Sequence, residues 1–298
     1  MKKILCLSGG GVRGVAQLQV LKKLEEDYGK PLHEVYDLII GTSVGAINAA
    51  IIASGTMSMA DVDKQYTEFM EAIFKKRGFF KKPKYDRQNF LEIWDEIAGF
   101  DFKMSDAKTR LMITTVDLVT DTNLFYKSWH EDDAKEKLGD LVTRSFAAPL
   151  YFGQIVDKEE RKVYSDGGIG NANLPLDEAK TQAESYGWYR DGEEVEIHAI
   201  GTLSSDATTT FDEVAKGKWT TQLMDYMKPA QGGLARVQSA EDQIRRMKYV
   251  CKHIPEIKFK YWNGLCNKKH MALDDTKYVD EYRQAGIKMA EKPSITCN

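Results

Sequence analysis

Residues 41–45 carry a serine between two glycines, at the spacing of an activated nucleophile. They read Gly41-Thr42-Ser43-Val44-Gly45, a G-x-S-x-G pattern, between an apolar run and a helical pattern. At such a strand-to-helix turn the serine hydroxyl is exposed at the sheet edge, and the glycines leave room for the neighbouring strand and helix. N–H groups at the start of the helix favour the negative charge that develops during attack on an ester. The alternative is a serine that only caps the helix, and this segment alone leaves both interpretations open.

A glycine-rich turn one strand earlier can supply hydrogen-bond donors for the same reaction. Its six residues are Gly9, Gly10, Gly11, Val12, Arg13 and Gly14. Both turns follow neighbouring strands of a parallel unit, so we expect the N–H groups of Gly10 and Gly11 to point at the space above Ser43. An acyl-transfer enzyme needs such donors for its tetrahedral oxyanion, and we therefore predict an oxyanion hole here. Arg13 either adds positive charge beside this hole or pairs structurally with a carboxylate.

The same turn also has the spacing of a dinucleotide-binding fingerprint. Gly9, Gly11 and Gly14 satisfy G-x-G-x-x-G. That interpretation requires an acidic residue at the end of the second strand, where it would bind the ribose. The second predicted strand ends without an acid, and Asp37 lies at its beginning. The sequence therefore disfavours a bound dinucleotide.

Asp166 is the best candidate for the base that accepts the serine proton. It ends a predicted strand, and Gly167 and Gly168 let the chain turn away and leave the carboxylate at the sheet edge. Asp-Gly alone is also an ordinary turn signal. None of the five histidines lies in an obvious catalytic turn, and each is expected to be at the surface or structural: His33, His130, His198, His253 and His270. Desolvation is expected to raise the pKa of Asp166, which would serve first Ser43 and then the water that hydrolyses an acyl-enzyme.

The elements that position these turns alternate between strand and helix over the first 55 residues. We predict strands at residues 4–7 and 36–40, and helices at residues 13–28 and 44–54. Strands and helices alternating at this spacing indicate right-handed crossovers and a parallel sheet.

The rest of the chain shows no internal boundary. Residues 57–107 have mostly helical spacing, and the elements predicted next are strands at 110–117 and 123–128, a helix to about 148, a hairpin of 152–156 with 161–165, and a strand at 194–200. Beyond about residue 205 the pattern is helical, with one possible strand at 256–261 and a last helix at 276–291. We expect one domain over residues 1–298, with a core at about 3–201 and a helical C-terminal covering at 205–298.

Composition limits the classes of function. The chain is 42% apolar and 29% charged with a net charge of −3, which gives no reason to expect a nucleic-acid partner. No stretch reaches the roughly 20 apolar residues that a membrane span needs. The four cysteines are widely spaced and form no metal-binding pattern: Cys6, Cys251, Cys266 and Cys297. We therefore expect a reducing, cytoplasmic setting and no zinc site.

Several segments, taken in order, resemble the patatin-like phospholipases. The turn at residues 8–14 is similar to the family's D-G-G-G-x-[KR]-G motif with Ser8 in place of the acid, and residues 41–45 match its nucleophile motif. Further similar segments are 144–152 (R-A-S-x-A-x-P-x-x-F, with one residue fewer), 166–168 (D-G-[GA]), 173–175 (the Asn-Pro element) and 272–275 (the closing segment). The Ser8 departure leaves the chemistry unaffected, because the oxyanion donors are backbone groups.

The resemblance implies a three-layer α/β/α fold with a mostly parallel sheet, and hydrolysis of acyl chains from phospholipids or related lipids. It implies a Ser43–Asp166 dyad without histidine, with Gly167 and Gly168 as its support, and neither a metal nor a cofactor. Within the enzyme class, the alternative is a generic carboxylesterase with a Ser-His-Asp triad. From a different class, a catalytically silent lipid-binding protein on the same scaffold remains open.

A lipase must also reach a lipid surface. Phe79 and Phe80 lie among six basic residues within 75–84, and aromatic and basic side chains together can dock on an anionic membrane. The alternative is a solvated loop whose phenylalanines pack inward. We expect a cytoplasmic protein that contacts the membrane transiently when it acts. The sequence does not indicate acyl position, headgroup preference, an activator or the oligomeric state.

Overall fold

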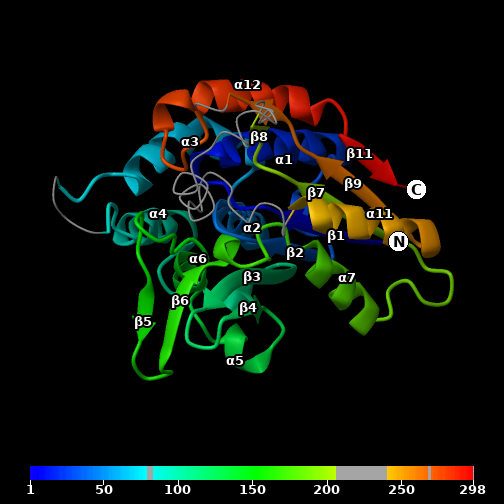
Figure 1. The fold of residues 1–298 in the computed structure, drawn as a ribbon, viewed down its shortest axis with the longest axis horizontal. Helices are drawn as coiled ribbons and strands as arrows, with labels where there is room; N and C mark the ends of the chain where they lie inside the picture. The colour runs from blue at the N-terminus through cyan, green and yellow to red at the C-terminus, as the bar shows by residue number, and fades with distance from the viewer. Residues whose placement is uncertain (79–82, 206–239, 268–269, 298) are drawn as a thin grey trace, which may run out of the picture.

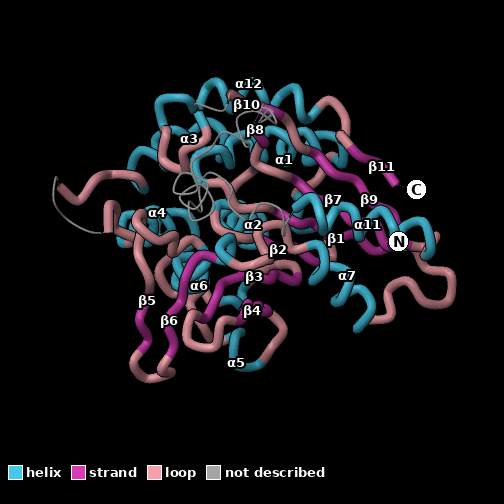
Figure 2. Tube along the Cα trace, in the orientation of Figure 1, coloured by secondary structure: helices cyan, strands magenta, loops and turns pink. Residues whose placement is uncertain are grey.

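The computed structural model describes residues 1–298 except 79–82, 206–239, 268–269 and 298 (Figure 1). Within the described residues, nine strands form one mixed sheet in the order β11-β9-β7-β1-β2-β3-β6-β5, and β4 pairs with β3 (Figure 2). The strands are β1 Lys2–Leu7, β2 Leu38–Gly41, β3 Arg110–Asp117, β4 Thr122–Lys127, β5 Ile155–Asp157, β6 Lys162–Asp166, β7 Val195–Ile200, β9 Ile257–Trp262 and β11 Ile295–Cys297. A separate pair is formed by β8 Ser204–Ser205 and β10 Leu265–Cys266.

The centre of the sheet is parallel. The strands β9, β7, β1, β2 and β3 run in one direction, whereas β4, β5, β6 and β11 pair antiparallel to their neighbours. The central strands are buried on both faces, as parallel strands covered by helices should be. Leu5 and Leu7 of β1 belong to one apolar core, and Ile4 and Cys6 belong to the other. This alternation produces three layers and confirms the predicted α/β/α fold.

Helices cover both faces of the sheet. They are α1 Gly14–Tyr28, α2 Val44–Ser54, α3 Met59–Ile73, α4 Gln88–Ala98, α5 Glu131–Ala134, α6 Leu138–Ser145, α7 Leu176–Ser185, α11 Asp242–His253 and α12 Val279–Ala290. The helices α1, α2, α3, α4, α6 and α12 bury side chains in the first core, and α7 and α11 in the second. No helix among the described residues is long and apolar enough to cross a bilayer.

The elements differ from the predicted ones mainly in the second half of the chain. The helix expected to reach about residue 148 is two helices, α5 and α6, and it ends at Ser145, before Pro149. The helix α7 was not predicted. The strand expected at 256–261 is β9, and it extends the main sheet beside β7, with β11 at the edge. Within the part of residues 205–298 that the structure describes, α11 and α12 are helical coverings, whereas β9 and β11 complete the sheet.

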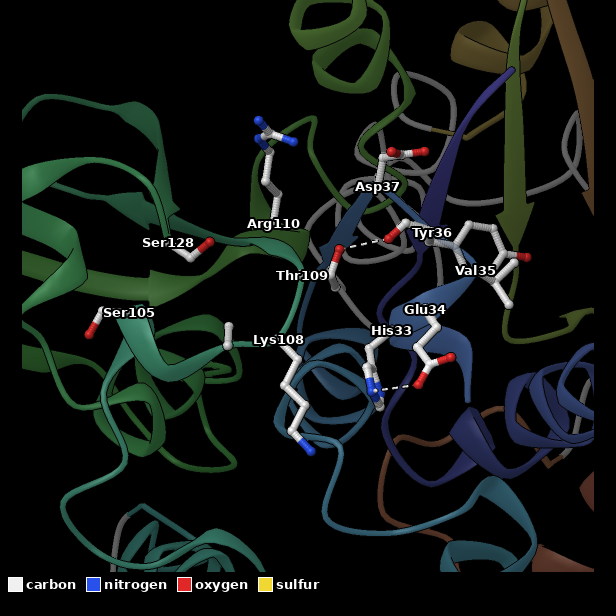
Figure 3. A pocket seen from close by; sticks show the side chains of 11 residues that line it. His33, Glu34, Val35, Tyr36, Asp37, Ser105, Lys108, Thr109, Arg110 and Ser128 are labelled. Carbon is white, nitrogen blue, oxygen red and sulfur yellow. Dashed lines mark hydrogen bonds and ion pairs between the residues drawn. The ribbon is translucent and has the colours of Figure 1, made fainter. Parts of the chain in front are cut away.

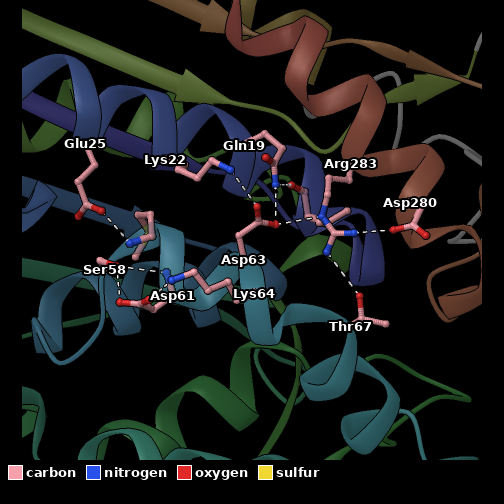
Figure 4. Close-up of polar contacts among 12 residues, drawn as sticks. Gln19, Lys22, Glu25, Ser58, Asp61, Asp63, Lys64, Thr67, Asp280 and Arg283 are labelled. Atoms are coloured by element: carbon pink, nitrogen blue, oxygen red, sulfur yellow. Dashed lines mark hydrogen bonds and ion pairs between the residues drawn. The ribbon is translucent and has the colours of Figure 1, made fainter.

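One half-buried carboxylate joins three helices that cover the same face of the sheet. Asp63 of α3 accepts hydrogen bonds from Gln19 (2.8 Å) and Lys22 (3.0 Å) of α1 and from Arg283 (3.0 Å) of α12 (Figure 4). These hydrogen bonds compensate for the partial loss of water around the carboxylate. The C-terminal helix is thus fixed to the N-terminal half of the chain.

Candidate active site

Ser43 lies at the turn between β2 and α2, in a strained backbone conformation. Its φ of 55° and ψ of −123° are unusual for a residue with a side chain. The flanking glycines are sterically required. A Cβ on Gly41 would lie 2.4 Å from the carbonyl oxygen of Gly45, and a Cβ on Gly45 would lie 2.3 Å from that of Leu7. The turn thus has the geometry of a nucleophile elbow.

The structure brings Ser43 and Asp166 together. The Ser43 Oγ donates a hydrogen bond of 2.8 Å to Asp166 Oδ2, and the Gly168 N–H donates one of 2.7 Å to Asp166 Oδ1. Asp166 ends β6, where it pairs with Thr115 of β3, so the sheet itself sets its position. His198 is buried elsewhere in the sheet, with its Nδ1 2.7 Å from the Tyr36 hydroxyl.

The surroundings of Asp166 change its acidity. Burial raises the pKa of this carboxyl from 3.8 to about 6, against the opposing hydrogen bonds from Gly168 and Ser43. The carboxylate is a stronger proton acceptor than an exposed aspartate, and it is still ionised at neutral pH.

Asp166→Asn is expected to stabilise the fold at neutral pH. The folded-state pKa lies above the unfolded one, so the contribution of Asp166 to stability is lost as the pH rises from about 4 through about 6. Asparagine has no charge to desolvate, and the variant should gain up to about 3 kcal/mol at pH 7.5 and little at pH 4. Urea unfolding at both pH values measures this difference. An equal gain at both would contradict it.

Contacts within the glycine turn leave two backbone donors unused. The Gly9 N–H donates to the Asn173 carbonyl (3.2 Å), the Val12 N–H donates to the Leu273 carbonyl (2.9 Å), and the N–H of Gly14 is also bonded. Among the described residues, the N–H groups of Gly10 and Gly11 have no hydrogen-bond partner. Of the six residues predicted for the oxyanion hole, these two can donate to a ligand.

The other residues of the turn hold it in place. Arg13 is buried and donates to the carbonyls of Thr202 (3.0 Å) and Met271 (2.5 Å). The Thr202 hydroxyl donates to the Gly9 carbonyl (2.7 Å). A Cβ on Gly9 would lie 3.0 Å from the Ser43 Cβ, so glycine lets the turn approach the nucleophile closely.

An apolar pocket opens beside Ser43, Gly11 and Asp166. Its remaining lining comes from α2, α3, the 146–152 segment and Leu273: Val44, Ile47, Met70, Ile73, Phe74, Phe146, Ala148, Tyr151, Phe152 and Leu273. Such a lining suits a hydrocarbon chain and keeps water from Ser43 and Asp166.

Thr42, the other residue predicted for the elbow, is turned away and bonds to Thr114 Oγ1 (2.6 Å) and the Ala172 carbonyl (2.7 Å). Phe79 and Phe80 lie outside the described residues.

Ser145 is a site residue that motif reasoning did not single out. It is fully buried at the end of α6, and its Oγ accepts a hydrogen bond of 2.9 Å from the Ser43 N–H. The bond satisfies a donor that the strained elbow would otherwise leave unpaired. The sequence signal was the position of Ser145 in the 144–152 segment, but that segment alone gives no partner for it.

Ser145→Ala is expected to lower kcat about tenfold with little change in KM, because an unpaired buried donor costs about 1–3 kcal/mol and loosens the elbow. Steady-state kinetics on a soluble short-chain ester measures this effect. Ser54→Ala is the matched control, because Ser54 is also buried but lies at the opposite end of α2. Unchanged kcat in Ser145→Ala would remove the role assigned to this hydroxyl.

The elbow, its carboxylate partner and the sheet define a class of protein, the serine hydrolases that act on carboxylic esters. Residues 5–180 match the family described as Patatin-like phospholipase. The chain belongs to the patatin-like phospholipase family.

Two bacterial phospholipases are similar to this chain in sequence, and one solved structure is similar in fold. The chain is 32% identical over 247 residues to a cGAMP-activated phospholipase of Pseudomonas aeruginosa, with 76% of this chain and 71% of the relative covered. It is 28% identical to a protein of the same description from Escherichia coli, with 73% and 67% covered. Among solved structures, VipD from Legionella pneumophila is 14% identical with a TM-score of 0.49, and the match covers 97% of this chain and 66% of VipD.

Proposed function

We propose that the chain hydrolyses ester-linked fatty acyl chains of phospholipids, with Ser43 as nucleophile and Asp166 as base. The observation that carries this proposal is the 2.8 Å hydrogen bond from Ser43 Oγ to a buried carboxylate, next to an apolar pocket. The acyl chain contacts the apolar side chains of this pocket next to the ester carbonyl, and the glycerophosphate headgroup stays outside. The protein acts at a membrane surface as a peripheral enzyme, and it needs neither a metal nor a cofactor.

The reaction proceeds in two acyl transfers. Ser43 Oγ attacks the ester carbonyl while Asp166 accepts its proton, and the N–H groups of Gly10 and Gly11 donate to the oxyanion. The tetrahedral intermediate collapses to an acyl-enzyme, and Asp166 returns the proton to the departing lysophospholipid oxygen. A water molecule then gives a proton to Asp166 and attacks the acyl-enzyme. When the second tetrahedral intermediate collapses, the bond to Ser43 Oγ breaks, Asp166 returns the proton to this oxygen, and the fatty acid is released.

The activity is expected to rise with pH through about 6 and then level off. Below that pH the Asp166 carboxyl is protonated, because its raised pKa is about 6, and it cannot accept the Ser43 proton. The measurement is kcat/KM against pH with a short-chain ester that does not ionise in this range. An acid limb near 4 would contradict the raised pKa, provided that the fold is intact at each pH.

Fatty-acid release from mixed phospholipid vesicles in the presence of EDTA tests the proposed function. Release supports a metal-independent phospholipase. Hydrolysis of a soluble ester without release from vesicles would indicate a generic carboxylesterase. Vesicle binding without hydrolysis of either substrate would indicate a silent lipid-binding protein.

The relatives from Pseudomonas and Escherichia are described as cGAMP-activated, and we propose that this chain also responds to a cyclic dinucleotide. The vesicle assay should therefore be run with and without cGAMP. Stimulated release supports this form of regulation, and equal release with and without cGAMP argues against it.

A further inference from the structure

A polar pocket lies at the edge of the sheet opposite to Ser43. It has a volume of about 540 Å³ and lies where β2 and β3 begin (Figure 3). Its lining comes from residues 33–37, 105 and 107–110, and from Ser128. The volume lies within the range of about 300–1,000 Å³ that small-molecule sites occupy. The mechanism at Ser43 does not use this pocket.

Two cations line the pocket without a carboxylate partner among the described residues. The Lys108 ammonium donates to the Gly55 carbonyl (3.3 Å), and the Arg110 guanidinium lies over the rings of Tyr186 (5.0 Å) and Trp188 (5.8 Å). Cations without an anionic partner, held beside a cavity, attract an anionic ligand.

The acids of the pocket do not cancel this charge. Asp37 is paired with Lys2 (2.7 Å) and also accepts from the Lys3 N–H (3.0 Å). The Glu34 carboxylate lies 4.0 Å from His33 Nε2, and its side chain is 56% exposed. The charge of Asp37 is balanced by Lys2. The positive charges of Lys108 and Arg110 therefore outnumber the negative charge of Glu34.

The arrangement suits a phosphodiester with a base attached. A guanidinium that stacks on rings keeps its N–H groups in its own plane, where two can bind one phosphate. Hydroxyls of Ser105, Thr109 and Ser128 line the same cavity. Trp129 follows Ser128 and packs edge-on against Tyr186 (6.1 Å), so aromatic rings lie next to Arg110, just outside the lining of the pocket. Aromatic side chains and cations together are the usual means of binding a nucleotide base and its phosphate.

The geometry points to this pocket as the binding site for a nucleotide phosphodiester of the cyclic dinucleotide class, which regulates hydrolysis at Ser43. The regulatory part of this inference rests on the proposed function, whereas the binding part does not. Lys108 and Arg110 bind the phosphates, and the rings beside Arg110 receive a base.

Three rigid elements connect the pocket to the active site. The strand β2 begins directly after Asp37 and ends at the elbow, and β3 begins at Arg110 and pairs with Asp166 through Thr115. Helix α2 begins directly after Ser43, and at its far end the Ala53 carbonyl accepts from the Lys108 N–H (2.8 Å). An 11-residue helix is about 16 Å long. A ligand that pulls Lys108 away from this helix end would act on the element that carries the nucleophile.

Calorimetric titration with cGAMP tests the binding part. The double variant Lys108→Gln/Arg110→Gln should bind at least about tenfold more weakly than wild type, because charge-assisted contacts to phosphate are lost. The matched control is Lys158→Gln/Lys292→Gln, which removes two positive charges from exposed residues outside the pocket. Inorganic phosphate and phosphatidylglycerol vesicles serve as comparison ligands for all three proteins.

Tight binding of cGAMP by wild type and by the control, lost in the pocket variant, supports the inference. No cGAMP binding by wild type, or equal binding by the pocket variant, overturns it. Loss of vesicle binding alone in that variant also overturns it, because the pocket would then be a headgroup contact. Ser43→Ala should bind cGAMP as wild type does. If wild type binds cGAMP but releases no fatty acid, the proposed hydrolysis is rejected and the binding site is retained.

Discussion

Ser43→Ala is expected to abolish fatty-acid release, and Asp166→Asn is expected to lower it by about 10³-fold or more. Alanine removes the atom that forms the acyl-enzyme. Asparagine keeps the shape of the carboxylate but cannot accept the proton of Ser43 Oγ, and general bases contribute roughly 10²–10⁴-fold. Because Asp166 serves both acyl transfers, this loss is expected whichever of the two steps limits the rate. Initial rates on vesicles and on a short-chain ester measure both effects.

Two controls make this result decisive. Circular dichroism and urea unfolding must show that both variants fold. At neutral pH, Asp166→Asn should be more stable than wild type. His198→Gln tests the rival triad, because His198 lies in the sheet with its Nδ1 against the Tyr36 hydroxyl. A folded Asp166→Asn variant that retains activity, together with an inactive histidine variant, would exclude the dyad.

Gly11→Ala is expected to lower kcat/KM by about 10²–10³-fold, the usual effect of losing one oxyanion donor. Gly11 has a φ of +59°, and a Cβ there would lie 2.2 Å from the carbonyl oxygen of Leu273. The turn must therefore move, and the N–H groups of Gly10 and Gly11 move with it. The assay uses a soluble short-chain ester, so that membrane binding does not enter the result.

Gly29→Ala is the matched control for this substitution. Gly29 has nearly the same φ, +63°, but a Cβ there would have no atom within 4 Å. Both variants pay the backbone cost of about 1–2 kcal/mol, and only Gly11→Ala meets Leu273. Equal activity losses in the two variants would show that general destabilisation, and not the oxyanion turn, is responsible.

The parts of the site that lie within single short segments could be predicted from sequence. The glycines of 41–45 and the apolar run before them indicate the elbow, because strand, turn and helix signals there are all local. The approach of Ser43 to Asp166 followed from the sheet edge and from the family resemblance. The partner of the Ser43 N–H could not be predicted, since Ser145 reaches it only through the packing of α6.

The fold was predicted less well where strands pair over long distances. Residues 257–262 look like an isolated strand in the sequence, but β9 lies beside β7 in the sheet. Nothing local to residues 295–297 indicates that β11 pairs with β9. The helix α7 has four exposed-looking charged residues among ten, which hides its buried face. Such pairings depend on the whole core and leave little local signal.

The supports of the glycine turn have a consequence for protein synthesis. The turn is held by Asn173, Thr202 and Leu273, which are distant from it in the chain. At translation rates of about 5–20 residues per second, residue 273 leaves the ribosome roughly 10–50 s after Ser43. A nascent chain therefore carries its nucleophile well before the segment that completes the oxyanion turn. A chain that stops before residue 273 is therefore expected to lack the complete oxyanion turn even though it already contains Ser43.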